Sequence, residues 1–266
     1  MTERTRAFEL DALRGFSIIM MVIHHFMFDV RYLLQTDLFA MQESFVFVNI
    51  LRPFFVCVFL FVSGICSVFS KSNLKRSARM FIAALVLSIG MGAISILFDM
   101  KMYVFFNILH LIALGTFIAW VFERLEIFWI NRNNAINQPL VIIEAKINTI
   151  IIILAMVIFM AVRIVEYFDR QVSHYFFLPF GILPRSFVTM ADYLPVIPWL
   201  GIFFLGIVAG RTVYKRKGTA FPGAPSQVKS LTRPIEWVGR HALPVYVLHQ
   251  PILLAILFSG RYLGLW

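Results

Sequence analysis

Charged residues are scarce in this chain of 266 residues. They make up 14% of it, against about a quarter in soluble domains, while hydrophobic residues make up 60%. Cysteine is rarer still: Cys57 and Cys66 are nine positions apart, so on one helix about 13 Å of rise would separate them, too far for a disulfide. The composition excludes an ordinary soluble domain and a disulfide scaffold, and it predicts a membrane protein.

Several sequence motifs are missing as well. The chain has no Walker loop, no G-x-G-x-x-G turn after a strand and no H-E-x-x-H, which argues against nucleotide hydrolysis and zinc chemistry, and we expect no metal. It has no internal repeat of the kind found in many transporters. Acidic residues among the first arginines and the lack of a small-residue cleavage site argue against a cleavable signal peptide.

What the chain does have is apolar segments long enough to cross a bilayer, which takes about 20 residues each. We place them at residues 15–34, 46–69, 78–98, 102–122, 147–168, 196–214 and 242–259. They predict an all-α polytopic membrane protein with about seven transmembrane helices, forming a single domain over residues 1–266. Residues 123–146 fit least well, and are either a cytoplasmic loop with an interfacial piece or the early start of a long fifth helix.

The cations alternate between connections. Lys and Arg are frequent before the first segment and after the second, fourth and sixth, where Arg211 begins the last group, and infrequent in residues 36–44, 99–101 and 169–195. The positive-inside rule then predicts a cytoplasmic N-terminus and an external C-terminus. The net charge of +10 follows from this topology, so we expect membrane lipid and no nucleic acid among the partners.

The first segment carries ionisable groups on one helical face. Arg14 and His25 are eleven positions apart, close to three turns, which places them about 16 Å apart on the same side. His25 and Asp29 are four apart, the spacing at which helix side chains meet. Because a charge at mid-bilayer costs about 2.5–3.5 kcal/mol on insertion scales, such residues indicate function. A carboxylate beside a histidine is typical of an oriented general base.

Two further histidines, His110 and His249, are expected at a depth similar to that of His25, in the middle third of the bilayer. Helix packing could gather the three into one site, although any one membrane histidine can equally be structural. His24 points about 100° away from His25, which favours a packing role.

Cations at the inner helix ends could hold a phosphorylated ligand entering from the cytoplasm, although each alone could serve topology only. They are Arg14, Lys75, Arg76, Arg79 and Arg240. Arg52, before Pro53 in the outer half of the second segment, could bind an anion, pair with Asp29 or extend to the interface. The external residues 169–195 combine aromatic rings with Asp192, a pattern that suits a sugar-binding surface or an interfacial anchor equally well.

Five blocks of sequence resemble one known family. They are FELDALRGFSIIMMVIHHFMFD (residues 8–29), LFVSG (60–64), NILHLIALG (107–115), DYLPVIPWLGIFFLGIVAG (192–210) and GRHALPVYVLHQPIL (239–253). In this order they resemble the bacterial members of the heparan-alpha-glucosaminide N-acetyltransferase catalytic-domain family, in the transmembrane acyltransferase superfamily. Arg14 and His25 also match the Arg-x10-His pattern of the related acyltransferase-3 family. Asn107 departs from an expected glycine, and Ala242 from an expected serine.

The resemblance implies transfer of an acetyl group from cytoplasmic acetyl-CoA to a glycan or lipid-linked sugar outside a bacterial inner membrane. His25 would be the general base, oriented by Asp29, with His110 and His249 polarising the thioester or binding the acceptor. Arg14, Arg240 and the Lys75–Arg79 group would hold the CoA phosphates. Acceptor contacts would come from Arg52, Asp192, Tyr193, Trp199 and Gln250. Transient acetylation of a histidine is the competing route. A proton-coupled exporter is the alternative function, and homo-oligomer formation stays open.

Overall fold

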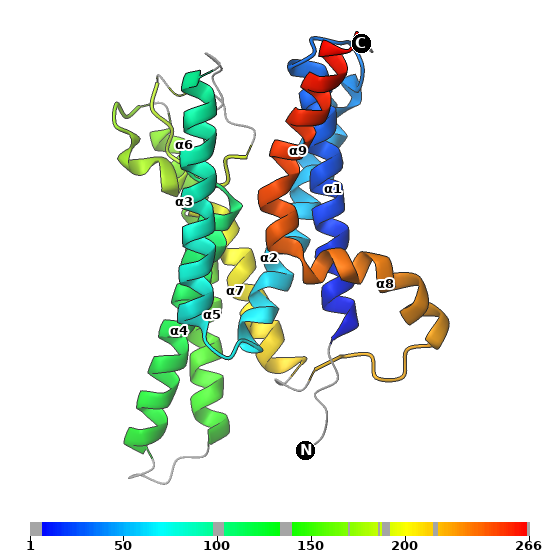
Figure 1. Ribbon diagram of the computed structural model, residues 1–266. Helices are drawn as coiled ribbons and strands as arrows, with labels where there is room; N and C mark the ends of the chain where they lie inside the picture. The colour runs from blue at the N-terminus through cyan, green and yellow to red at the C-terminus, as the bar shows by residue number, and fades with distance from the viewer. Residues whose placement is uncertain are drawn as a thin grey trace. The chain divides into compact units, whose positions relative to one another are not determined.

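The computed structural model describes residues 7–97, 104–133, 140–169, 171–185, 187, 192–214 and 218–264. Every regular element in these ranges is helical (Figure 1). In chain order they are α1 (Phe8–Tyr32), η1 (Ala40–Glu43), η2 (Phe47–Leu51), α2 (Arg52–Val68), α3 (Asn73–Leu97), α4 (Ile108–Asn133), α5 (Leu140–Met160), α6 (Val162–Phe168), η4 (Tyr175–Phe180), α7 (Val196–Thr212), α8 (Ser226–Arg240) and α9 (Ala242–Tyr262).

The helices confirm the polytopic all-α class. Within the described ranges, six helical stretches are long and apolar enough to cross a membrane, and α7 is a shorter apolar helix. Each predicted segment has its helix, but four helix starts differ from the prediction. The first helix begins at Phe8 instead of residue 15, and the third at Asn73 instead of residue 78. The fourth helix begins at Ile108 instead of residue 102, and the fifth begins at Leu140 instead of residue 147. The early-start interpretation is therefore correct for residues 140–146, whereas residues 123–133 continue α4, and residues 134–139 lie outside the described ranges.

The chain divides into two compact units, Met1–Val62 with Lys217–Trp266, and Ser63–Arg216. The first unit contains α1, α8 and α9, and the second contains α3 to α7, while α2 begins in the first and ends in the second. Each unit is described by itself below.

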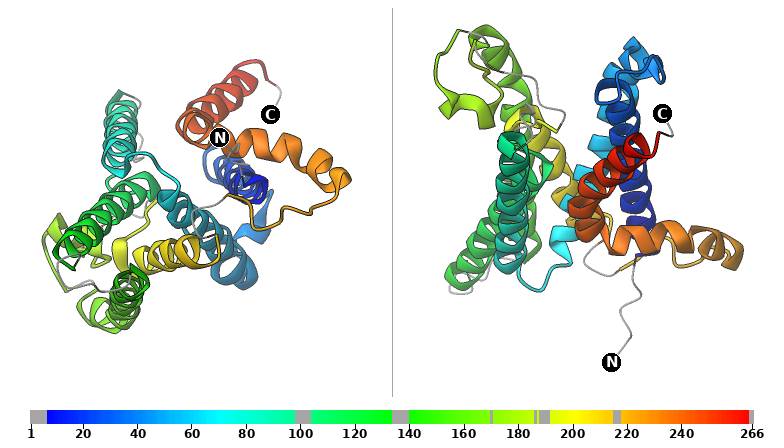
Figure 2. Two further views of the ribbon diagram at one scale, coloured as in Figure 1. Left: turned by 90° about the horizontal axis from the view of Figure 1, so that it is seen from below. Right: turned by 45° about the horizontal axis from the view of Figure 1, so that its top comes forward.

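In the first unit, α8 crosses the N-terminal part of α1 at a steep angle (Figures 1 and 2). The two backbones touch at a pair of glycines. A Cβ atom added to Gly15 would lie 1.9 Å from the carbonyl oxygen of Ile235, and one added to Gly239 would lie 1.8 Å from that of Asp11. Only glycine fits at either position. The turn before α8 is also tied to α1, because Glu9 accepts hydrogen bonds from the Thr219 hydroxyl at 2.8 Å and the Ala220 N–H at 2.7 Å.

In the second unit, α5 packs on α7 and α3 packs on α4. The buried side of α5 is a single stripe at four-residue spacing, Ile143, Ile147, Ile151 and Ala155, as expected of a helix whose other sides face lipid.

A buried ion pair joins three helices of the second unit. Arg211 of α7 donates to both carboxylate oxygens of Glu126 on α4, at 2.8 and 2.9 Å, and to the Asn148 side chain of α5 at 2.6 Å. Arg211 therefore lies in the last turn of α7 and not in the connection after it, where the sequence pattern placed it. Both carboxylate oxygens of Glu126 and the amide oxygen of Asn148 accept hydrogen bonds from the guanidinium. This explains why the charged group is tolerated in the protein interior.

The glycine contact between α1 and α8 can be tested by adding one methyl group. Gly239→Ala should lower the melting temperature of the detergent-solubilised protein, because separating the two backbones costs about 1–3 kcal/mol or more. Gly92→Ala in α3 is the matched control, since a Cβ there would meet nothing within 4 Å. This control should be neutral or stabilising by up to about 1 kcal/mol. Equal melting temperatures for the two variants would contradict the close contact.

Candidate active site

Four polar side chains form a buried cluster in the first unit. His25 and Asp29 lie on α1, and His249 and Gln250 lie on the adjacent α9. Both helices qualify as membrane spans, and His25, Asp29 and His249 are almost completely buried. Since uncompensated polar groups inside a bilayer are costly, their collection in one place marks this cluster as the candidate active site.

The contact that joins Asp29 to α9 is made by Gln250. The side-chain nitrogen of Gln250 donates to the two carboxylate oxygens of Asp29, at 3.2 and 3.0 Å. These hydrogen bonds hold the carboxylate in one orientation, one turn along α1 from His25. Gln250 is thus placed to support Asp29, whereas the sequence suggested only a contact with substrate.

The two histidines of the cluster face each other. The ring centres of His25 and His249 are 5.0 Å apart, with 59° between the ring planes. The Nδ1 atom of His249 lies 2.5 Å from the carbonyl oxygen of Tyr246. A carbonyl only accepts hydrogen bonds, so Nδ1 must carry the proton, and in the neutral ring Nε2 holds the lone pair. The cluster therefore contains an imidazole with a defined basic nitrogen besides His25.

The ring of His24 lies beside this cluster, with its centre 5.7 Å from that of His25. The same ring packs on Phe47 of η2, with centres 5.3 Å apart, and on Phe28 at 6.5 Å. These contacts agree with the packing role that its position on the helix suggested. Arg52 is half-buried at the first position of α2, directly after the π-helical η2.

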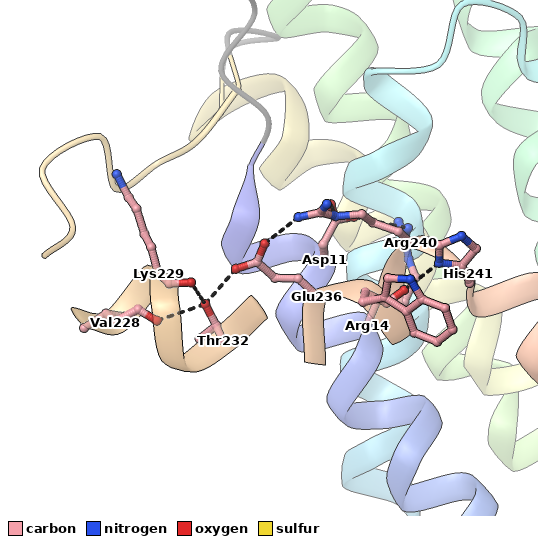
Figure 3. A network of polar contacts seen from close by, with 9 residues as sticks. Asp11, Arg14, Val228, Lys229, Thr232, Glu236, Arg240 and His241 are labelled. Atoms are coloured by element: carbon pink, nitrogen blue, oxygen red, sulfur yellow. Dashed lines mark hydrogen bonds and ion pairs between the residues drawn. The ribbon is translucent and has the colours of Figure 1, made fainter. Parts of the chain in front are cut away.

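At the N-terminal end of α1, Arg14 and Arg240 are held by carboxylates (Figure 3). The buried carboxylate of Asp11 lies 3.8 Å from Arg14 and 3.6 Å from Arg240, and Glu236 accepts a hydrogen bond from Arg240 at 2.7 Å. Arg14 also donates to the carbonyl of Gly239 at 3.5 Å, and the Thr232 hydroxyl donates to Glu236 at 2.7 Å. Two arginines thus pair with two carboxylates, so the positive charge of these predicted phosphate-binding residues is partly compensated.

The acidic partners were missed in the sequence, although their spacing was a usable signal. Asp11 precedes Arg14 by three residues and Glu236 precedes Arg240 by four, the intervals at which helical side chains meet. The contact between Asp11 and Arg240 could not be read in this way, because it depends on the crossing of α1 and α8.

The other candidate phosphate-binding cations, Lys75, Arg76 and Arg79, lie in the first two turns of α3, in the second unit. Lys75 and Arg79 are exposed and Arg76 is half-buried. The start of this helix is fixed by Asn73, whose side chain donates to the Ser67 carbonyl at 2.9 Å and to Glu123 at 2.6 Å.

His110 also belongs to the second unit, in the first turn of α4. The predicted fourth segment began at residue 102, which placed His110 further inside the helix than it is, because Asn107 ends the preceding loop as an N-cap. The Asn107 side-chain oxygen accepts hydrogen bonds from the N–H groups of Leu109 and His110, at 3.1 and 3.3 Å. It also lies 2.9 Å from Nδ1 of His110, so the departure from glycine at 107 orients this ring.

On the predicted external side, Tyr193 has a structural contact. Its hydroxyl donates to the carbonyl of Leu178 at 2.6 Å, and burial raises the pKa of this hydroxyl well above its usual value, so it stays a donor. Asp192 and Trp199 are half-buried, whereas the aromatic rings of η4 are exposed. In the described part of the chain, no three His, Cys, Asp or Glu side chains are grouped to hold a metal ion.

Buried histidines with a supported carboxylate, inside helices that qualify as membrane spans, are an arrangement that can carry out acid–base chemistry within a bilayer. Residues 6–251 match the family described as heparan-alpha-glucosaminide N-acetyltransferase, catalytic, and the chain belongs to this family. It is therefore a multi-pass membrane protein of an N-acetyltransferase family. Neither a curated protein nor a solved structure matches the chain significantly.

Proposed function

We propose that the protein transfers an acetyl group from cytoplasmic acetyl-CoA to an amino sugar or related glycan at the outer face of a bacterial inner membrane. The observation that carries this proposal is the buried cluster of His25, Asp29, His249 and Gln250 in two membrane-spanning helices. Membership of an N-acetyltransferase family supports the acyl-transfer chemistry and favours an amine as acceptor.

In the proposed reaction, the acceptor nitrogen attacks the thioester carbon, a C–N bond forms and the C–S bond breaks. His25 takes the proton that the nitrogen loses, and the CoA sulfur leaves as a thiolate that is then protonated. Asp29 stabilises the imidazolium of His25, and Gln250 holds Asp29 in place. The lone pair on Nε2 of His249 makes this residue the second proton carrier of the site.

The role of His25 is tested by His25→Gln, which keeps a polar side chain of similar size but removes the base. Turnover should fall by about 10²–10⁴-fold with little change in acetyl-CoA binding, because a general base acts only in the transition state. The assay is acetyl-CoA consumption by purified protein in nanodiscs, with His24→Phe as control because it keeps a ring on Phe47. Normal turnover in His25→Gln together with inactive His249→Gln would move the base to α9. Activity in both variants would exclude the histidine mechanism.

The role of Gln250 is tested by a double-mutant cycle with Asp29. Gln250→Leu should lower turnover because it removes the two hydrogen bonds to the carboxylate. If Gln250 acts through Asp29, the same substitution should cost much less in an Asp29→Asn background, with a coupling energy of about 0.5–3 kcal/mol. Additive effects on turnover, or an effect on KM for the acceptor alone, would instead make Gln250 a substrate contact.

For the CoA phosphates we propose Arg240 as the accessible ligand, since 43% of its side chain is exposed. Glu236 would compete with the phosphate for this guanidinium. Arg240→Gln should therefore weaken acetyl-CoA binding, whereas Glu236→Gln should tighten it, both by a few-fold and less so at high salt. Both variants lose the same ion pair, so a purely structural pair predicts equal effects on affinity. Isothermal titration at two salt concentrations separates these outcomes.

A further inference from the structure

Helix α8 has two chemically different faces besides the side that packs on α1. At about 100° per residue, Val228, Leu231 and Ile235 form one apolar ridge. Lys229 and Arg233 share the opposite face, whereas Arg240 pairs with Asp11 of α1. Leu231 is 82% exposed and Val228 is 44% exposed, so much of the ridge is uncovered within this chain. An apolar ridge of this kind needs a partner.

The level at which α8 meets α1 indicates that partner. The crossing occurs at Asp11 and Gly15, where α1 enters the predicted hydrocarbon span at residue 15. Because α8 runs across the axis of α1 and its N-terminal half extends beyond it (Figures 1 and 2), it lies along the membrane surface when α1 spans the membrane. Trp237, 58% exposed near the other end of α8, is a residue type enriched at this interface.

Charge points to the same partner. Glu236, the single acidic residue of α8, is buried and bound by Arg240 and Thr232. The charges of α8 outside this ion network are therefore positive: Arg233, and Lys229, whose ammonium group lies 5.8 Å from the centre of the Phe8 ring. An apolar ridge opposite a cationic face is typical of helices that lie in the interface of membranes containing anionic lipids.

We propose that α8 is an interfacial helix, with Val228 and Leu231 inserted among lipid acyl chains and Lys229 and Arg233 in the anionic headgroup layer. The anchorage is rigid, because Glu9 holds the turn before α8 and the contact of Gly15 with Gly239 holds its C-terminal half. The lipid surface thereby sets the position of Arg240 at the inner end of α1. This inference concerns membrane binding and does not depend on the proposed acceptor or donor.

The test measures the depth of two positions on opposite faces of α8. In full-length protein with Cys57→Ala and Cys66→Ala, Leu231→Cys and Arg233→Cys are labelled separately with a polarity-sensitive bimane. The protein is placed in nanodiscs of phosphatidylcholine and phosphatidylglycerol carrying doxyl lipids. The label at 231 should be blue-shifted and quenched several-fold more strongly than that at 233. Equal quenching, or water exposure at both positions, would overturn the proposal. A blue-shifted label at 231 that lipids do not quench, in protein that sediments as a dimer, would also overturn it, because a second copy would then cover the ridge.

The cationic face is tested on the same nanodiscs. Lys229→Glu with Arg233→Glu should lower the amount of phosphatidylglycerol retained with the protein in native mass spectrometry. Arg163→Glu is the control, because this side chain is 90% exposed but lies outside α8. Unchanged retention in the α8 variant, or equal loss in both, would contradict a headgroup contact at Lys229 and Arg233.

Discussion

The contacts of α1 with two other helices govern everything described in the first unit. At its inner end, Gly15 lies against α8 so closely that no side chain fits between the backbones. Further along, Asp29 accepts two hydrogen bonds from Gln250 of α9. Because α8 and α9 are separated by a single residue, His241, one helix pair is fixed to α1 at both levels. The direction in which α1 presents His25 therefore depends on its contacts with both α8 and α9.

Hydropathy and spacing predicted the helices and two residues of the buried polar cluster, because both are local properties of the chain. The spans near residues 46–69 and 242–259 match η2–α2 and α9, and the four-residue interval between His25 and Asp29 correctly placed both in the buried cluster. The start of α4 was missed because capping by Asn107 outweighs the apolar character of the residues before it. Gln250 as partner of Asp29, and Asp11 as partner of Arg240, depend on which helices cross, and no single-sequence pattern reports a crossing.

Ion pairing within the folded chain changes what its cations imply about ligand binding. Their positions in the sequence indicate the membrane topology and suggest a group of cations that binds phosphate. In the folded chain, Arg211 is neutralised by Glu126, and Arg14 and Arg240 by Asp11 and Glu236. Buried carboxylates of this kind allow arginines to remain near hydrocarbon, since an unpaired charge there is costly. A phosphate ligand must compete with these carboxylates for the arginines. Its affinity therefore depends on the difference in free energy between the arginine–phosphate pair and the arginine–carboxylate pair, and not on net charge alone.

The same compensation explains why α8 has a part in both membrane binding and the candidate donor site. Glu236 and Arg240 join the ion network with Asp11 of α1, which leaves Lys229 and Arg233 as the charges of α8 outside that network. Ile235 lies at the contact with Gly15 through its backbone, whereas the Val228 and Leu231 side chains of the ridge are exposed. A helix with one face used by glycine contact and another by ion pairs must turn its apolar residues elsewhere. In a multi-pass membrane protein, the surface next to that ridge is lipid.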